Sequence, residues 1–337
     1  MKPFAYLRAR SADEAVQQSA ARPGAVFLGG GTNLVDLMKL GVENPELLID
    51  ITGLPLDHVA DTADGGLRIG ATVRNSDLAA HPGVRTRYPA LSQALLSGAS
   101  GQLRNTATTG GNLLQRTRCP YFQDTSKPCN KRAPGTGCPA RDSDQRDLAV
   151  LGHSAQCVAT HPSDLAVALS ALDATVHLHG PDGARTVPAT GFHRLPGDTP
   201  DRDTEIRPDE LITEVVLPPR PDGAASLYRK ARDRASFAFA LASVAAVLSV
   251  RGGRIDHAAL AFGGLAHRPW RAHAAEDLLR GAPATAETFA RAVDAELAAA
   301  RPLRDNAFKV GLARNLAVDA LVELAADSRP TQRRPQP

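Results

Sequence analysis

The spacing of hydrophobic and polar residues predicts short helices and strands that alternate through the first fifty residues. Ser11 is a candidate N-cap, and Glu14 follows three residues later, which is the pattern of a capping box. The predicted elements are, in order, a helix at 11–21, a buried strand at 24–29, a helix at 32–41 and a strand at 46–51. We interpret residues 1–55 as a small α/β unit.

Two later stretches alternate hydrophobic and polar residues around glycine-containing turns, and they therefore predict β-hairpins. Patterns with helical spacing lie between them, and one helix begins after Ser163, a further N-cap candidate. The predicted elements are hairpins at 58–73 and 174–189, helices at 75–80, 85–97 and 161–173, and a strand at 210–218. We expect 56–220 to form a second unit.

The pattern changes after residue 220, where strands precede a series of strongly periodic helices. A strand at 226–232 and two more within 242–265 predict a β-meander, and helices are predicted at 274–281, 286–300 and 306–326. This order predicts a separate α+β domain at 221–326. The last stretch, 327–337, has no apolar periodicity, and we predict that it is disordered.

Composition and charge exclude several classes of protein. Hydrophobic residues make up 43% of the 337-residue chain and charged residues 22%, as in ordinary globular domains. The formal net charge of +3 comes from interleaved basic and acidic residues, so no nucleic-acid-binding face is expected. No apolar run is long enough to span a bilayer. The N-terminus carries no signal-peptide pattern, so nothing in the sequence is expected to export this chain by itself.

Two glycine-rich loops are the first candidates for ligand binding. The loop "FLGGGTNL" (27–34) lies between a predicted strand and a predicted helix, and "RNTATTGGNLLQ" (104–115) has the same character. Consecutive glycines leave backbone N–H groups open to a ligand, and the following helix adds the positive end of its dipole. Neither loop is a P-loop or a Rossmann fingerprint. Together they favour a dinucleotide held by a non-Rossmann fold.

Five motifs, in order, resemble one known family. "FLGGGTNL", "NTATTGGNL", "THPSDLAVAL", "ELITEVVLP" and "YRKARDRASFAFALASVA" look like the FAD-binding medium subunit of the molybdenum hydroxylases, the family of xanthine dehydrogenase and carbon monoxide dehydrogenase. The resemblance covers about residues 3–325. It implies an α+β fold: a two-subdomain FAD-binding fold, similar to that of vanillyl-alcohol oxidase, followed by a C-terminal α+β domain of the CO dehydrogenase flavoprotein type.

The resemblance also implies which residues contact FAD. It assigns the pyrophosphate to the first loop, the other side of the cofactor to the second, and a ligand-contacting role to Asp164 of "HPSD". Leu211 or Ile212 would flank the isoalloxazine, and Lys230 would lie near the flavin. The residues so implied are Leu28, Gly29, Gly30, Gly31, Thr32, Asn33, Thr108, Gly111, Asn112, Asp164, Leu211, Ile212 and Lys230.

All four cysteines lie in one segment that is rich in proline, glycine and charge. Their spacing, C-x9-C-x8-C-x18-C, matches neither a zinc knuckle nor a compact ferredoxin motif. Ordering such a long loop requires a strongly bound centre. Four thiolates suit zinc and an iron–sulfur cluster equally well, so ligand number leaves both open. The candidate ligands are Cys119, Cys129, Cys138 and Cys157.

The family resemblance favours the cluster. Most medium subunits run from "GGNL" almost directly into the "SPxSD"-like motif, whereas this chain inserts residues at about 115–157. "RTRCPYF" and "KPCNKR" look like the subgroup with an extra [4Fe-4S] cluster, represented by the flavoprotein subunit of bacterial periplasmic aldehyde oxidoreductase. A [4Fe-4S] cluster is therefore the expected second cofactor beside FAD.

No motif for substrate chemistry is evident, so no catalytic residue is predicted. The expected function is electron transfer within a heterotrimeric molybdenum-dependent aldehyde oxidoreductase. Its expected partners are a large molybdenum-cofactor subunit, a small subunit with two [2Fe-2S] clusters, and a ferredoxin-like protein or small molecule as acceptor. The alternatives are a self-contained FAD oxidoreductase and a zinc-stabilised nucleotide-binding module. Cytoplasm and periplasm both remain open, since a partner subunit can carry the export signal.

Overall fold

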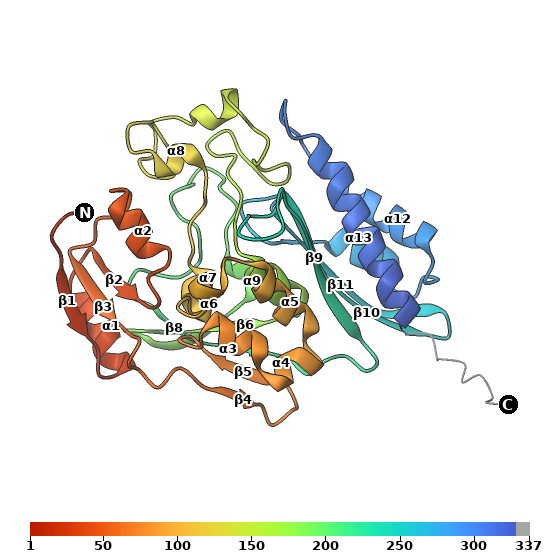
Figure 1. The fold of residues 1–337 in the computed structure, drawn as a ribbon, viewed down its shortest axis with the longest axis horizontal. Coiled ribbons are helices and arrows are strands. Elements are labelled where there is room, and N and C mark those ends of the chain that lie inside the picture. Colours follow the sequence, from red (N-terminus) through yellow and green to blue (C-terminus); the bar gives the residue numbers. More distant parts are fainter. Residues whose placement is uncertain (328–337) are drawn as a thin grey trace.

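A computed structural model describes residues 1–327 of the chain, and its N-terminal unit is a three-stranded parallel sheet with two helices (Figure 1). The strand order is β1-β3-β2. Ser11 accepts a hydrogen bond from the Glu14 N–H, which confirms the predicted helix start, and the Glu14 carboxylate accepts from the backbone of Arg10. The elements are β1 (Ala5–Arg8), α1 (Ala12–Ala21), β2 (Ala25–Leu28), α2 (Leu34–Lys39) and β3 (Leu47–Asp50).

The second sheet has five antiparallel strands in the order β4-β5-β8-β6-β7. Both predicted hairpins are confirmed, and the strand predicted at 210–218 lies between them. Successive residues of β8 face two different hydrophobic cores, because side chains alternate across a sheet. The strands are β4 (Val59–Asp61), β5 (Leu67–Gly70), β6 (Thr175–Gly180), β7 (Gly183–Pro188) and β8 (Leu211–Leu217).

Short helices cover this sheet. The single helix predicted at 85–97 is wrong: the chain breaks at Tyr88, because the ring of Pro89 disfavours a helical conformation in the residue before it. Ser163 caps α9 through the Ala166 N–H, as predicted. The helices are α3 (Asn75–Ala80), α4 (Pro82–Arg87), α5 (Pro89–Ser97), α6 (Gly101–Arg104), α7 (Thr109–Leu113), α9 (Asp164–Ala171) and α10 (Ala189–Phe192).

The C-terminal sheet has four antiparallel strands and is covered on both faces. In β10, Ala245 and Val247 pack with α5 and α9, whereas Val244, Ala246 and Leu248 pack with the C-terminal helices. Burial on both faces explains why this strand is a continuous apolar run. The elements are β9 (Ala225–Ala231), β10 (Ala242–Arg251), β11 (Arg254–Gly263), β12 (Trp270–Arg271), α11 (His273–Leu279), α12 (Ala286–Leu297) and α13 (Phe308–Asp327). The predicted disordered tail begins at 327, but Asp327 still belongs to α13, and residues 328–337 lie outside the described residues.

The cysteine-containing segment folds into a lobe that packs against α2, at the top of the view in Figure 1. Its regular structure is limited to α8 (Pro120–Gln123) and the 3₁₀ helix η1 (Pro139–Asp142). Lys309, at the start of α13, fixes the end of this segment from the C-terminal domain. Its side chain is fully buried, and its ammonium donates to the carbonyl oxygens of Asp147 (3.3 Å), Leu148 (2.8 Å) and Gly264 (2.6 Å).

Over residues 1–327, none of the helices combines the length and the apolar character that a membrane crossing requires.

We predict that Lys309→Met lowers the free energy of unfolding by about 2–3 kcal/mol, because it leaves buried carbonyl groups without a donor. Chemical denaturation of the variant and of the exposed control Lys2→Met measures the effect. An unchanged unfolding midpoint in Lys309→Met would contradict this account of how the lobe is attached.

Candidate functional site

A cavity of about 780 Å³ runs between the two glycine-rich loops and the C-terminal sheet. Its walls come from the start of α2, from α7, from the first residues of α9, and from β9 with the loop that follows it. The volume lies within the range of cofactor pockets, and polar and apolar groups both line it. The cavity is therefore the candidate cofactor site.

The two loops pack against each other without room for side chains. A Cβ atom added at Gly30 would lie 2.0 Å from the carbonyl oxygen of Thr106, and one at Gly29 would lie 2.8 Å from Thr108 Oγ1. Gly31 has a φ of +69°, a left-handed conformation that glycine adopts without strain. The glycines at 29 and 30 thus bring the loops together, and Gly31 turns the chain into the cavity.

Several buried polar atoms of residues along this cavity have no protein partner, and two of them are donors of Asn33 and Arg118. Asn33 occupies the N-cap position of α2, and its Oδ1 accepts from the backbone N–H of Arg116 (2.8 Å). Its Nδ2, and the Nε of Arg118, are buried without a hydrogen bond, although both residues line the cavity. Buried unpaired donors are costly, and an anion would satisfy them. These residues therefore fit the pyrophosphate of FAD.

Asp164 organises the opposite part of the cavity. Its carboxylate accepts from the hydroxyl of Tyr228 (2.5 Å) and from Lys230 Nζ (2.7 Å), and Lys230 also donates to the Ser97 carbonyl (3.1 Å). Burial, and then the Asp164 charge, raise the pKa of Tyr228 well above its ordinary value, so its hydroxyl remains a donor. Asp164 and Lys230 therefore present a fixed, paired set of polar groups to the cavity.

The structure brings some of the predicted FAD residues to this cavity and leaves others behind it. Those that line the cavity are Gly31, Thr32, Asn33, Gly111, Asn112, Asp164 and Lys230. Thr108 caps α7 beneath it, and Leu28, Gly29 and Gly30 lie in the strand and the loop contact. Leu211 and Ile212 are buried in hydrophobic cores and are not among the lining residues.

Sequence reasoning missed Arg118. It stands directly before the first cysteine, and the only sequence signal for it is a basic residue that closely follows the second glycine loop. In the structure its guanidinium lies over the Phe239 ring (5.1 Å to the centroid) and its pKa is lowered by burial. A partly desolvated cation at this position adds to the attraction for an anionic ligand.

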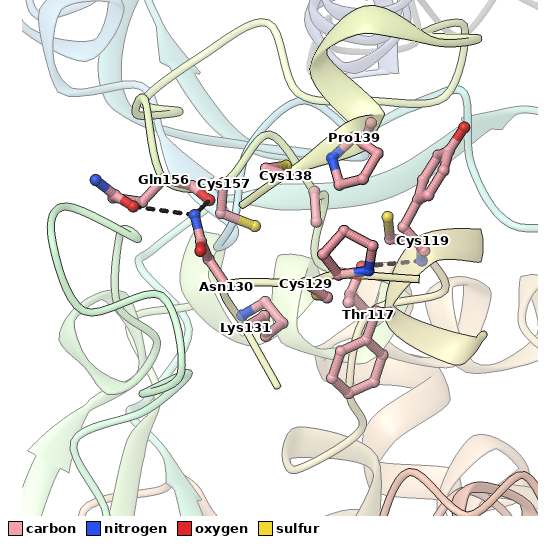
Figure 2. A pocket seen from close by; sticks show the side chains of 14 residues that line it. Thr117, Cys119, Cys129, Asn130, Lys131, Cys138, Pro139, Gln156 and Cys157 are labelled. Atoms are coloured by element: carbon pink, nitrogen blue, oxygen red, sulfur yellow. Dashed lines mark hydrogen bonds between the residues drawn. The ribbon is translucent and has the colours of Figure 1, made fainter. Parts of the chain in front are cut away.

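A second, smaller cavity is lined by all four cysteines. Figure 2 shows Cys119, Cys129, Cys138 and Cys157 arranged around one central space. The Cys119 N–H is 3.3 Å from Thr117 Oγ1, and Asn130 Nδ2 is bonded to the Gln156 side chain (3.0 Å). Thr117 and Cys119 also line the large cavity, so the two cavities share a wall.

The four cysteines are free thiols. Burial raises the pKa of Cys119 and of Cys138, and raises that of Cys157 to about 12. A metal centre would therefore have to displace protons from these thiols. Among residues 1–327, no group of three or more His, Cys, Asp or Glu side chains is arranged to hold a single metal ion.

A buried network of charges connects the two cavities. Lys131 lines the cysteine cavity, and its ammonium contacts Asp203 and the Pro200 carbonyl (2.8 Å). Arg116, whose backbone binds Asn33, bonds to Asp203 (2.7 Å) and Glu43 (2.5 Å). The positive charges of Lys131 and Arg116 hold the pKa of Asp203 far below its usual range despite burial, which acts in the opposite direction.

Comparison with known proteins places this architecture in one family. Residues 2–220 match the FAD binding domain in molybdopterin dehydrogenase, and residues 226–324 match the CO dehydrogenase flavoprotein C-terminal domain. The fold is similar to a chain of the carbon monoxide dehydrogenase from Hydrogenophaga pseudoflava, with a TM-score of 0.76, 28% identity, and coverage of 98% of this chain and 100% of that one. The expected fold is confirmed.

Two curated relatives agree with this result. The chain is 52% identical over 331 residues to the aldehyde oxidoreductase FAD-binding subunit PaoB of Escherichia coli, covering 97% of this chain and all of the relative. It is 29% identical to the glyceraldehyde dehydrogenase medium chain of Sulfolobus acidocaldarius, over 80% of this chain and 78% of that one. The chain therefore belongs to the FAD-binding medium subunits of the molybdenum hydroxylases and is an oxidoreductase subunit.

Proposed function

We propose that this chain carries FAD and a [4Fe-4S] cluster and transfers electrons within a molybdenum-dependent aldehyde oxidoreductase. The observation that carries the proposal is the pair of adjacent cavities, one at the glycine loops and one ringed by four cysteines, with Thr117 and Cys119 in both walls. Bound FAD and an iron–sulfur cluster supply carriers that accept and release electrons. The protein binds and orients these carriers and determines the electrostatic environment around them.

The FAD-holding role is assigned to both loops and to the Asp164 group. In this proposal the backbone of Gly31, Thr32 and Asn33 holds the pyrophosphate, together with the Arg118 guanidinium. Gly111 and Asn112 contact the cofactor from the second loop, and Thr108, Leu28, Gly29 and Gly30 shape the loops behind it. Asp164 and Lys230 face the flavin end. Leu211 and Ile212 support the site from the core.

The resemblance of the cysteine segment to the cluster-containing subgroup favours a cluster over zinc. Four thiolates around one zinc ion, each about 2.3 Å from it, must converge on a point. In a [4Fe-4S] cluster the thiolates bind separate irons around a larger core. All four cysteines line the same cavity, as either centre requires, so the preference for a cluster comes from the resemblance of this segment.

The relatives support the choice of substrate class and partners. A relative at 52% identity is the FAD-binding subunit of an aldehyde oxidoreductase, so we propose aldehydes as substrates of the complex. Oxidation of an aldehyde to the acid takes oxygen from water and releases two electrons and two protons. We propose that a large molybdenum-cofactor subunit performs it, and that a small subunit with two [2Fe-2S] clusters delivers the electrons to this chain. A ferredoxin-like protein or a small molecule would accept them.

The same proposal assigns a function to each domain of the chain. Residues 1–55 and 56–220 would form the two FAD-binding subdomains, with the cluster-binding insertion at about 115–157, and residues 221–326 would close the cofactor site. Lys309 bonds both to Leu148 of the insertion and to Gly264, directly after β11, which supports this division of the chain.

Gly30→Ala is expected to remove most of the bound flavin. Its new Cβ would collide with the backbone of Thr106 and force the loops apart, whereas Gly101→Ala, in the nearby α6, meets no atom within 4 Å. Flavin released per chain on denaturation measures occupancy. Equal flavin content in the two variants would contradict the role assigned to the loop contact.

Asn33→Asp is expected to weaken FAD binding at least tenfold, about 1.4 kcal/mol. The substitution keeps an oxygen for the Arg116 N–H, but it removes the unpaired Nδ2 donor and places a negative charge beside the pyrophosphate. Titration of the flavin-free protein with FAD, followed by flavin fluorescence, measures the dissociation constant. An unchanged constant would rule out a phosphate contact at Asn33.

Anaerobically purified protein is expected to contain about four irons and four sulfides per chain and little zinc. Cys129→Ser and Cys157→Ser should each lose most of the iron, because either change removes one of the four proposed ligands. Metal and sulfide assays with EPR spectra of the reduced protein provide the measurement. Stoichiometric zinc, or full iron retention in both variants, would refute the proposed cluster.

A further inference from the structure

One positively charged side chain lines the cysteine cavity. Among the described residues that line it, Lys131 is the only one with a charged side chain. Its side chain is 1% exposed, and Figure 2 draws it within the ring of lining residues. Lysines are rarely buried this deeply unless they are paired, and Lys131 is paired with Asp203.

Neighbouring groups hold the Lys131 side chain in place. The ammonium donates to the Pro200 carbonyl (2.8 Å) and to the Asp203 carboxylate, across about seventy residues of sequence. His267 Nε2 lies 3.9 Å from Asp203, but burial, and then the charge of Lys131, lower the pKa of His267 to about 3. The histidine is therefore neutral and does not compete with Lys131 for the carboxylate charge.

The charges of this network are arranged as a dipole directed at the cavity. Lys131 and Arg116 balance Asp203 and Glu43, so the group as a whole is neutral. Only Lys131 lines the cysteine cavity; the other three lie behind it. Since charges interact strongly over short distances in a buried, weakly polarisable region, the cavity experiences the positive end of the network.

We propose that Lys131 is the fixed positive charge that raises the reduction potential of the centre held by the four cysteines. This inference rests on the [4Fe-4S] cluster of the proposed function. Reduction adds one electron to a centre already surrounded by thiolates, and a nearby cation stabilises the added charge. The potentials of iron–sulfur clusters depend on net charge, hydrogen bonds to sulfur and exposure, and Lys131 supplies the first of these.

The proposed step is a one-electron reduction of the centre that the four cysteines hold. In the test, dithionite supplies the electron, and no bond of the Lys131 side chain is made or broken. Burying a lysine is costly even when it is paired, and an apolar residue of similar length would fill the space at lower cost. A role in raising the reduction potential explains why a lysine is buried here despite this cost.

The experiment compares wild-type protein with Lys131→Met, Lys131→Gln and Lys131→Arg, each purified anaerobically as the full chain or in its complex. Iron and sulfide are assayed first, and the midpoint potential is then measured by a dithionite titration monitored by EPR. Met and Gln both remove the charge but differ in polarity, whereas Arg keeps it. If packing determined the midpoint potential, the Met and Gln variants would differ from each other. If charge determined it, the two variants would have the same potential.

The proposal predicts that the equilibrium constant for reduction falls at least tenfold in both Lys131→Met and Lys131→Gln, a shift of about 59 mV to lower potential. Lys131→Arg should stay close to wild type. Unchanged potentials in Met and Gln variants that contain full iron would overturn the role of Lys131 while leaving the cluster intact. Wild-type protein without iron and sulfide would overturn the cluster, and this inference with it.

Discussion

The contact between two glycine-rich loops is the constraint on which the site depends. Gly30 packs so closely on the Thr106 backbone that no side chain fits at this position. This contact holds the two loops at one edge of the large cavity. Asn33 then ties the first loop to the chain that leaves the second one, through the Arg116 N–H. The position of the cysteine segment follows, because it begins directly after Arg116.

Arg116 connects the two cavities in two ways. It precedes the cysteine segment in the chain, and its side chain belongs to the buried charge network. Its guanidinium joins Glu43, near the N-terminal sheet, to Asp203, and Asp203 in turn holds Lys131 against the cysteines. Removing one member of a buried charge network leaves another charge buried without a partner, which destabilises the protein. We therefore regard the cysteine lobe as an integral part of this flavin subunit, even though its regular structure is sparse.

Local signals in the sequence predicted much of the fold. Ser11 with Glu14 fixed the start of α1, alternation revealed both hairpins, and the glycine runs identified the loops at the cavity. The strand β1 was missed because four exposed or half-buried residues give no clear period, and the helix break at Pro89 was overlooked. Arg118 and the Lys131–Asp203 pair were beyond sequence reasoning, since their surroundings come from segments far apart in the chain.

Leu211 and Ile212 illustrate a different limit. Their motif carried a resemblance to flavin-contacting residues, yet both side chains are buried in cores behind the cavity. A family motif identifies a segment more reliably than it identifies the direction of each side chain, because neighbouring residues of a strand face opposite sides.

A crystal structure of anaerobically purified protein, with anomalous diffraction recorded at the iron and zinc edges, tests the central claim most directly. The account predicts an iron signal inside the ring of four cysteines and flavin density along Gly31, Asn33 and Asn112. A zinc signal there, an empty ring in fully reduced and intact protein, or a flavin bound elsewhere would contradict it.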